Sequence, residues 1–317
     1  MRLPSFALTS LLALSSVSCA VGTILGRNAD AFFATPAAVP NRITQPRRAD
    51  ARLSVLWIGH ASALVQIDDK LILTDPVFTE TVGQVSRRLV EPGIDPANLP
   101  HVDAAVISHL HFDHLSVGSL AMIEKKLGLL VLPEKGSLAV PDFTCETVEL
   151  GTWAQVERGG LRITAAPVRH SGFRWGVDDG WMDVSFTGYV IEYHGIKVYF
   201  GGDTAYDQPR FAATGRRFPG IDLALLPIGP ISPREIMKSR HIDPHEALLA
   251  FRDLGARHLV PVHHSTFINS TDPIDEAPRV LREEMRRQGV PEDRVHILGI
   301  GEQKVLVAKG SPAPHRD

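Results

Sequence analysis

Four residues that can bind metal ions lie within six positions of the chain, in the segment SHLHFDHLS at residues 108–116. They are His109, His111, Asp113 and His114, and no lysine or arginine lies among them. Burying such groups together costs free energy unless an ion compensates them, so a purely structural role is the poorer explanation. Side chains two positions apart in an extended segment point the same way. His109 and His111 would therefore bind one ion, while Asp113 and His114 would face the position of a second ion.

Other histidines and aspartates follow predicted apolar strands, each at the point where the strand ends. Ligands of open α/β sheets lie beyond strand ends, so we expect these side chains to converge on one rim. Two metal ions about 3.5–4 Å apart repel each other and need a shared anionic ligand. Asp203 follows two glycines that let the backbone approach closely, and it suits that bridge. His170 would complete the ligands of the first ion and His263 those of the second. The residues at these strand ends are His60, Asp75, His170, Asp203, His263 and His264.

Composition limits the chemistry that the chain can perform. The formal net charge is −3 and there is no basic run, which argues against binding to a nucleic-acid backbone. There are 14 histidines and only 2 cysteines, so the expected metal ligands are nitrogen and oxygen. These ligands suit two divalent ions, with zinc as the expected metal and iron or manganese as alternatives.

The N-terminus has the features of an export signal. Arg2 precedes the apolar run FALTSLLALSSV at residues 6–17, and SCA at residues 18–20 fits a cleavage site, which predicts a signal peptide over residues 1–20. The apolar run is too short to span a bilayer. The sequence SVSC also resembles a lipoprotein box, in which Cys19 would carry a lipid. Export would leave the protein either free in the periplasm or anchored to the membrane at Cys19.

The rest of the chain predicts a single folded domain. Residues 21–52, rich in Ala, Pro, Arg and Asn, are expected to form a linker or a loosely packed arm, and residues 310–317 a disordered tail. Between them, over residues 53–309, many strands come first and helices are interspersed later, which predicts an α/β domain with mixed sheets covered by helices. Helices are predicted over 116–127, 243–255 and 274–288, the second with Asp243 as its N-cap, and two closing strands over 295–308.

These residues resemble a known superfamily. SHLHFDH resembles the HxHxDH signature of the metallo-β-lactamase fold, and Asp75, His170, Asp203 and His263 occur in the order of its other motifs. The resemblance implies an αββα sandwich, with two mixed β-sheets flanked by helices and the metals at one edge. It assigns His109, His111 and His170 to the first zinc, and Asp113, His114 and His263 to the second. It also implies that Asp203 bridges the ions and that Asp75 orients a ligand histidine.

A narrower likeness concerns the branch that contains N-acyl phosphatidylethanolamine phospholipase D. The segments WIGHASALVQID, GGDTAYD, PIGPISPREIMKSRHIDPHEAL and PVHHSTF resemble that branch, in which a histidine matching His241 lies near the substrate phosphate. The chain departs from it at Ser171 and His264, where the relatives usually carry tryptophan. Trp175 is a candidate replacement. These departures leave the predicted metal ligands intact.

The predicted site favours hydrolysis by a hydroxide that bridges the two ions and attacks phosphorus or a carbonyl carbon. Asp113 and Asp203 would orient the hydroxide. His241 and His60 are candidates for stabilising a phosphoryl oxygen or protonating the leaving group, and His264 either does the same or faces solvent. The favoured function is a phosphodiesterase acting on a phospholipid-like or small phosphodiester. The alternatives are a lactonase or other carboxylic ester or amide hydrolase, and a metal-binding protein without catalytic activity.

Overall fold

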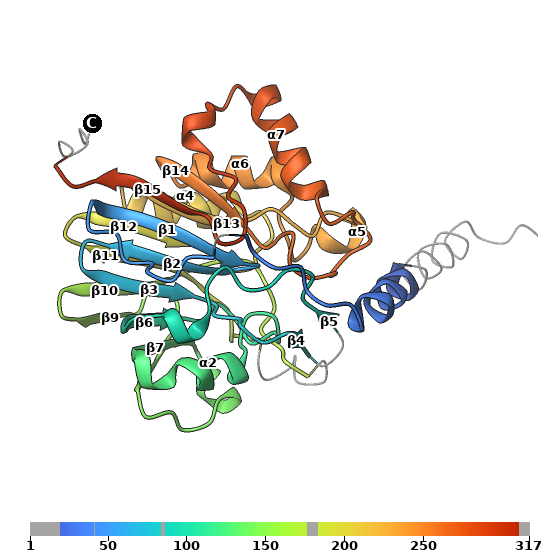
Figure 1. The fold of residues 1–317 in the computed structure, drawn as a ribbon. Helices are drawn as coiled ribbons and strands as arrows, with labels where there is room; N and C mark the ends of the chain where they lie inside the picture. The colour runs from blue at the N-terminus through green and yellow to red at the C-terminus, as the bar shows by residue number, and fades with distance from the viewer. Residues whose placement is uncertain (1–19, 41, 84–85, 176–182, 311–317) are drawn as a thin grey trace, which may run out of the picture.

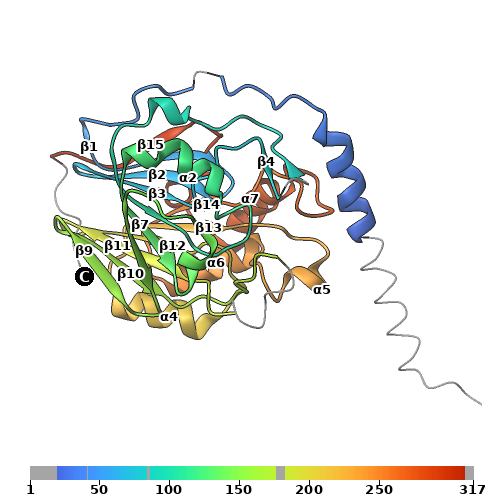
Figure 2. The same ribbon diagram turned by 90° about the horizontal axis from the view of Figure 1, so that it is seen from below.

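The protein is described by a computed structural model that covers residues 20–40, 42–83, 86–175 and 183–310. Two large mixed β-sheets pack face to face, and helices cover both outer faces (Figures 1 and 2). This is the αββα sandwich that the resemblance implied. Most of the predicted signal peptide, with Cys19, and most of the predicted tail lie outside the described residues. Within the described part of the chain, no helix combines the length and the apolar character needed to span a membrane.

The first sheet has seven strands in the order β15-β1-β2-β3-β6-β7-β8. Strands β1, β2, β3 and β15 pair antiparallel, whereas β3, β6, β7 and β8 pair parallel. The bounds are β1 Ala51–Gly59, β2 Ser62–Ile67, β3 Lys70–Thr74, β6 Val102–Val106, β7 Leu127–Pro133, β8 Glu146–Leu150 and β15 Gln303–Ala308.

The second sheet has six strands in the order β14-β13-β12-β11-β10-β9. Strands β12, β13 and β14 are parallel, and the others are antiparallel. The bounds are β9 Gln155–Arg158, β10 Leu161–Ala166, β11 Gly188–Tyr193, β12 Ile196–Phe200, β13 Leu223–Pro227 and β14 His258–Val262. A separate short hairpin joins β4 (Thr81–Val82) to β5 (Ser86–Arg87).

The sandwich core lies between the sheets, where Trp57 and Ile72 of the first sheet and Ile191 and Phe200 of the second belong to one buried apolar cluster. A second cluster fills the space between the second sheet and helices α4, α6 and α7, and a third lies on the outer face of the first sheet with α2. The helices are α2 Val117–Ile123, α4 Gln208–Arg217, α5 Arg234–Met237, α6 Pro244–Asp253 and α7 Glu276–Gln288, with 3₁₀ turns η1 Pro96–Asn98, η2 Glu124–Lys126, η3 Gly136–Ala139 and η4 Glu292–Arg294.

Several predicted elements differ from those found. Residues 20–32 form a helix, where the sequence led us to expect a linker or loose arm. The two closing strands predicted over 295–308 reduce to β15, because the preceding segment contains Gly299 and Gly301, and Gly301 has a left-handed φ of 87°. Strands β9 and β13 and helix α4 had not been predicted. The predicted cap of α6 is confirmed, since the Asp243 side chain accepts a hydrogen bond from the Glu246 amide.

Candidate metal centre

The residues predicted to bind metal lie together at one end of the sandwich, and both sheets contribute. The first sheet supplies the segment from His109 to His114, which follows β6. The second sheet supplies His170, Asp203 and His263, which follow β10, β12 and β14. Their potential ligand atoms form several groups in which every atom lies within 4.8 Å of the others.

Four of the histidines share one arrangement. In each, Nδ1 is hydrogen-bonded to a neighbour on the outer side, while Nε2 is turned toward the centre. Such a bond places the proton on Nδ1 and leaves the Nε2 lone pair available for a metal. The partners of Nδ1 are Ser108 Oγ for His109 at 2.9 Å, Asp75 Oδ2 for His114 at 2.6 Å, Arg240 O for His170 at 3.0 Å and Gly229 O for His263 at 3.0 Å.

The first group consists of His109, His111 and His170. His111 Nδ1 lies 2.8 Å from His109 Nε2 and 3.5 Å from His170 Nε2. Nitrogens bound to one tetrahedral zinc at about 2.0–2.1 Å are roughly 3.4 Å apart, so these three atoms have nearly the spacing that one ion requires.

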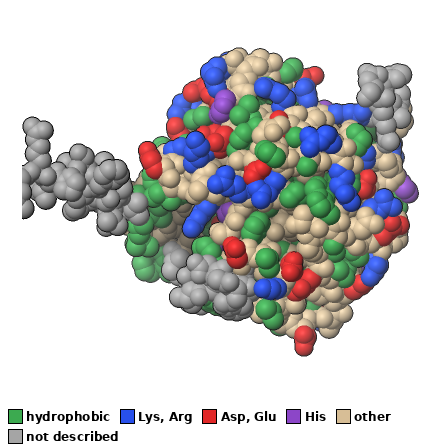
Figure 3. All heavy atoms as spheres, turned by 180° about the vertical axis from the view of Figure 1, so that it is seen from behind, with side chains coloured by type: hydrophobic (Ala, Val, Ile, Leu, Met, Phe, Trp, Pro, Cys, Tyr) green, Lys and Arg blue, Asp and Glu red, His purple; other side chains and the backbone are tan. Residues whose placement is uncertain are grey.

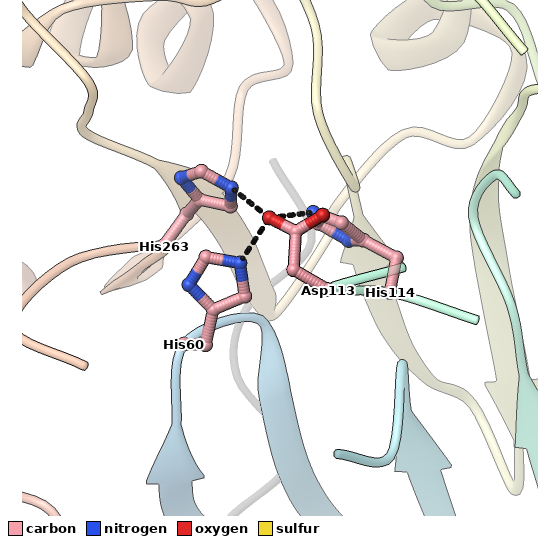
Figure 4. A group of neighbouring side chains, drawn as sticks. All are labelled: His60, Asp113, His114 and His263. Carbon is pink, nitrogen blue, oxygen red and sulfur yellow. Dashed lines mark hydrogen bonds and ion pairs between the residues drawn. The ribbon is translucent and has the colours of Figure 1, made fainter. Parts of the chain in front are cut away.

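The second group surrounds the carboxylate of Asp113 (Figure 4). Its Oδ2 lies 3.7 Å from His114 Nε2 and 3.8 Å from His263 Nε2, the two histidines predicted to share an ion with it. His60 Nε2 is closer, at 2.9 Å. The predicted ligands of the second ion are therefore adjacent, and His60 is a fourth member of their group.

Asp203 lies between the two groups. Its Oδ2 is 3.9 Å from His109 Nε2 and 3.2 Å from Nε2 of both His114 and His263. Burial opposes ionisation of this carboxyl group, but the neighbouring histidines, His263 first, hold its pKa well below the usual range. An ionised carboxylate in this position meets the requirement of the predicted bridge.

The centre contains buried polar atoms that no described residue satisfies by a hydrogen bond. A buried polar atom without a partner costs about 1–3 kcal/mol. Coordination by a cation would remove that cost, and histidine nitrogen with aspartate oxygen suits zinc, iron or manganese. The residues present therefore fit divalent metal ions. The unsatisfied atoms include Asp203 Oδ1, His114 Nε2, His241 Nδ1 and His263 Nε2.

Asp75 supports two ligand histidines from behind. It is fully buried and accepts a hydrogen bond from His114 directly. It also accepts from the amide and the hydroxyl of Ser108, at 2.7 and 2.6 Å, and the Ser108 hydroxyl in turn contacts His109. Ser108 was missed in the sequence, although it directly precedes the first histidine. The second glycine before Asp203, Gly202, lies so close to Ser108 that a Cβ at Gly202 would be 2.2 Å from Ser108 Cβ. This contact explains why a glycine occupies the position.

Three residues of the centre adopt left-handed backbone conformations that residues with side chains rarely take. They are His60, Asp75 and His263, with φ of 53°, 34° and 61°. Such conformations cost on the order of 1–3 kcal/mol each, and they persist where surrounding contacts fix them. The three side chains are therefore held in place by their backbones as well as by their hydrogen bonds.

His60 occupies a different position from the one expected of a residue that touches substrate. It is 1% exposed, and its ring lies between His263, with centroids 4.0 Å apart, and Phe267, at 5.1 Å. Burial, followed by the charge of His263, lowers its pKa to about 3, so the ring is neutral at neutral pH. A neutral ring that contacts Asp113 at 2.9 Å acts by positioning that carboxylate.

His241 and His264 lie in different surroundings. His241, which precedes α6, lies 3.5 Å from Asp203 Oδ2 through Nδ1, and its side chain is 14% exposed, so it borders both the centre and solvent. His264 is buried, packs against Trp57 with the rings tilted and their centroids 4.3 Å apart, and belongs to none of the metal-binding groups found among the described residues. The expectation that His264 faces solvent is therefore wrong, because its side chain is buried, while a contact with substrate stays a prediction.

A cavity of about 280 Å³ opens beside the centre. His111 and Asp113 of the centre line it, together with the polar residues Ser86, Arg174 and Asn269. Beyond Phe112 it shares lining residues with a second cavity of about 520 Å³, which reaches α2 and Trp175. Sizes of this order suit drug-sized ligands. The apolar walls of the smaller cavity are Val82, Phe112, Phe173, Phe267 and Ile268.

Comparisons with known proteins agree with this geometry. The beta-lactamase superfamily domain family matches residues 70–264. An N-acyl-phosphatidylethanolamine-hydrolyzing phospholipase D 1 of Caenorhabditis elegans is 30% identical over 246 residues, which cover 73% of this chain and 68% of that protein. An uncharacterized protein of Mycobacterium tuberculosis (strain ATCC 25618 / H37Rv) is 34% identical over 257 residues, and the chain spans 66% of its length.

Solved structures show the same fold. Igni18, described as a novel metallo hydrolase from Ignicoccus hospitalis, matches with a TM-score of 0.59 and 21% identity. The match covers 80% of this chain and 97% of that one. At this identity the likeness concerns the fold alone.

Proposed function

Since this chain belongs to the beta-lactamase superfamily and is a metal-dependent hydrolase of that fold, we propose that it hydrolyses a phosphodiester, either phospholipid-like or small. The reaction class is suggested by the relative from Caenorhabditis elegans, whose name describes a phospholipase D. The observation that carries the substrate class is the apolar cavity that opens on His111 and Asp113.

The cavity supports a lipid-like substrate through its shape and its walls. The reacting phosphate would lie next to His111 and Asp113, and an apolar arm would extend between Phe112 and Phe173. The continuation past Phe112 toward Trp175 offers room for a longer chain. Burying apolar surface contributes about 25 cal/mol per Å², so each buried methylene group would strengthen binding.

The proposed metals are two zinc ions, one held by His109, His111 and His170 and the other by Asp113, His114 and His263, with Asp203 shared. When bound, such ions lower the pKa of water and stabilise negative charge on the oxygens of the substrate.

The protein's own residues would perform three tasks. Asp113, fixed by the contact with His60, orients the attacking water. His241 is the polar side chain best placed to donate a hydrogen bond to a phosphoryl oxygen, because it borders both Asp203 and solvent. Burial lowers the His241 pKa to about 4, so it would act as a neutral donor and not as a cation at neutral pH. The aromatic walls of the cavity exclude competing water.

The test is hydrolysis of bis(p-nitrophenyl) phosphate by the metal-loaded protein, with a lactone and a carboxylic ester in parallel. Turnover of the diester that a chelator removes and added zinc restores is the expected result. Turnover of the lactone or ester alone would replace the proposal with an acyl hydrolase. No turnover of any substrate by protein of measured metal content would indicate a non-catalytic metal-binding protein.

A cavity variant tests the lipid-like substrate separately. Val117 lines the larger cavity, and Val117→Trp would fill part of it. We expect this variant to lose far more activity on a long-chain phospholipid than on bis(p-nitrophenyl) phosphate. Equal effects on both substrates would remove the larger cavity from the substrate path.

A further inference from the structure

An arginine directly precedes each of two histidines at the rim of the centre, as Arg169 before His170 and Arg240 before His241. Both arginine residues are exposed. No acidic side chain of the described residues forms an ion pair with Arg240. The chain has a net charge of −3, so a cation beside the centre that no described carboxylate pairs with is a local feature and not a consequence of a basic protein. On the face seen in Figure 3, Lys and Arg side chains gather across the middle.

The backbone of Arg240 is fixed to the metal centre. Its carbonyl oxygen accepts the hydrogen bond from His170 Nδ1 at 3.0 Å, and its amide donates to Met237 O at 2.9 Å. The guanidinium carbon lies 5.6 Å from the centre of the Phe173 ring. Phe173 in turn lies edge to face with His111, with ring centroids 4.7 Å apart. The Arg240 charge is thus one aromatic ring away from a predicted metal ligand.

Other cations near the cavity are engaged in different contacts. Arg174 lies over the Phe112 ring and donates hydrogen bonds to the carbonyl oxygens of Leu110 and Leu115, at 2.6 and 3.0 Å. Arg169 and Lys238 line a separate cavity of about 330 Å³ that also contains two carboxylates, those of Glu235 and Glu246. Arg240 lines neither this cavity nor the one beside the centre. No described carboxylate pairs with its guanidinium, which lies over Phe173, a wall of the cavity beside the centre.

We propose that Arg240 binds a carboxylate carried by the alcohol arm of the phosphodiester and thereby selects substrates that have one. The inference rests on the proposed function. A guanidinium presents parallel N–H donors that match the two oxygens of a carboxylate, and Phe173 supports the flat face of the group. The single charge of Arg240 balances a single carboxylate. The carboxylate would lie across Phe173 from the reacting phosphate.

Dihexanoyl phosphatidylserine and dihexanoyl phosphatidylethanolamine provide the test, because their alcohol arms differ by one carboxylate. We expect the metal-loaded wild-type enzyme to prefer the serine ester by about tenfold in kcat/KM, mainly through KM, as for a charge-assisted hydrogen bond. Arg240→Gln should abolish the preference. Arg240→Lys should retain part of it, because lysine keeps the positive charge but lacks the parallel N–H donors of the guanidinium. Arg216→Gln, which changes an exposed arginine on α4, is the matched control and should keep the wild-type preference.

A binding measurement distinguishes a failure of this inference from a failure of the proposed function. Glycerophosphoserine and glycerophosphoethanolamine are titrated into the metal-loaded protein by calorimetry, which requires no turnover. If neither lipid is hydrolysed but glycerophosphoserine binds more tightly and Arg240→Gln removes the difference, the phosphodiesterase proposal fails and the role of Arg240 stands. Equal binding of the two ligands to the wild type, or a preference that survives Arg240→Gln with metal content unchanged, would overturn the inference.

Discussion

Replacing Asp75 by asparagine tests whether the metal centre depends on support from behind its ligands. Asp75 Oδ1 accepts from the Ser108 amide, and Oδ2 accepts from the Ser108 hydroxyl and from His114 Nδ1. An asparagine has one acceptor oxygen and one NH₂ group. In either orientation the NH₂ group faces an N–H or O–H donor, so at least one of the present bonds is lost without replacement.

The size of the effect follows from these contacts. Hydrogen bonds to a charged group contribute about 1.5–3 kcal/mol each, and the carboxylate is fully buried. Loss of a group that orients a metal ligand typically weakens metal binding 10–100-fold, which is about 1.4–2.8 kcal/mol. Both His114 and His109 depend on Asp75, the second through Ser108, so we expect weaker binding at both ions.

The assay is competition for zinc with a chromophoric chelator, followed by urea unfolding of the metal-free protein. Asp103→Asn is the matched control. Asp103 accepts from Lys70 Nζ and the Leu71 amide at the opposite end of β3 and β6, so its replacement should lower the free energy of unfolding without changing zinc affinity. Wild-type zinc affinity in Asp75→Asn would refute the reasoning, and so would an equal loss of affinity in Asp103→Asn.

Three further predictions concern the centre and the pH dependence of stability. Asp203→Ala should lose metal, measured by elemental analysis, and activity together; full activity would contradict the shared-ligand arrangement. His241→Ala should lower kcat about 10²–10³-fold, as for the loss of one hydrogen-bond donor to a developing oxyanion, with metal content intact, whereas metal loss would make His241 a ligand. Half-burial, followed by the charge of His258, lowers the His296 pKa from 6.5 to about 4, so the folded protein prefers the neutral ring. Its contribution to stability is complete above pH 6.5 and is lost as the pH falls through 4, and after allowance for solvent screening it amounts to about 1–2 kcal/mol. His296→Asn should therefore flatten the fall in unfolding free energy between pH 7 and 4.5, and an unchanged slope would contradict this.

The features that the sequence predicted correctly depend on residues that lie close together in the chain. The histidine cluster after an apolar strand and the cap at Asp243 each depend on residues close in sequence, and the structure has both where they were expected. The contact between His60 and Asp113, 53 positions apart, depends on how the β1–β2 turn lies over the end of β6. The same holds for the bond from His170 to Arg240 O, which joins segments 70 positions apart. No periodicity or spacing encodes such pairs.

The predicted metal ligands come from both sheets, which would link metal binding to the packing of the sandwich. His109 and His114 belong to the first sheet, and Asp203 to the second. The two sheets' loops touch where Gly202 approaches Ser108, and only a residue without Cβ fits that contact. Because the ligand set exists only when the sheets are packed, ions that bind the folded state and not the unfolded chain must stabilise the fold. The hydrogen bonds to Nδ1 and the left-handed backbone conformations then have one explanation. They hold each ligand in place before the ion binds, so binding of the ion does not have to offset the entropy cost of ordering the site.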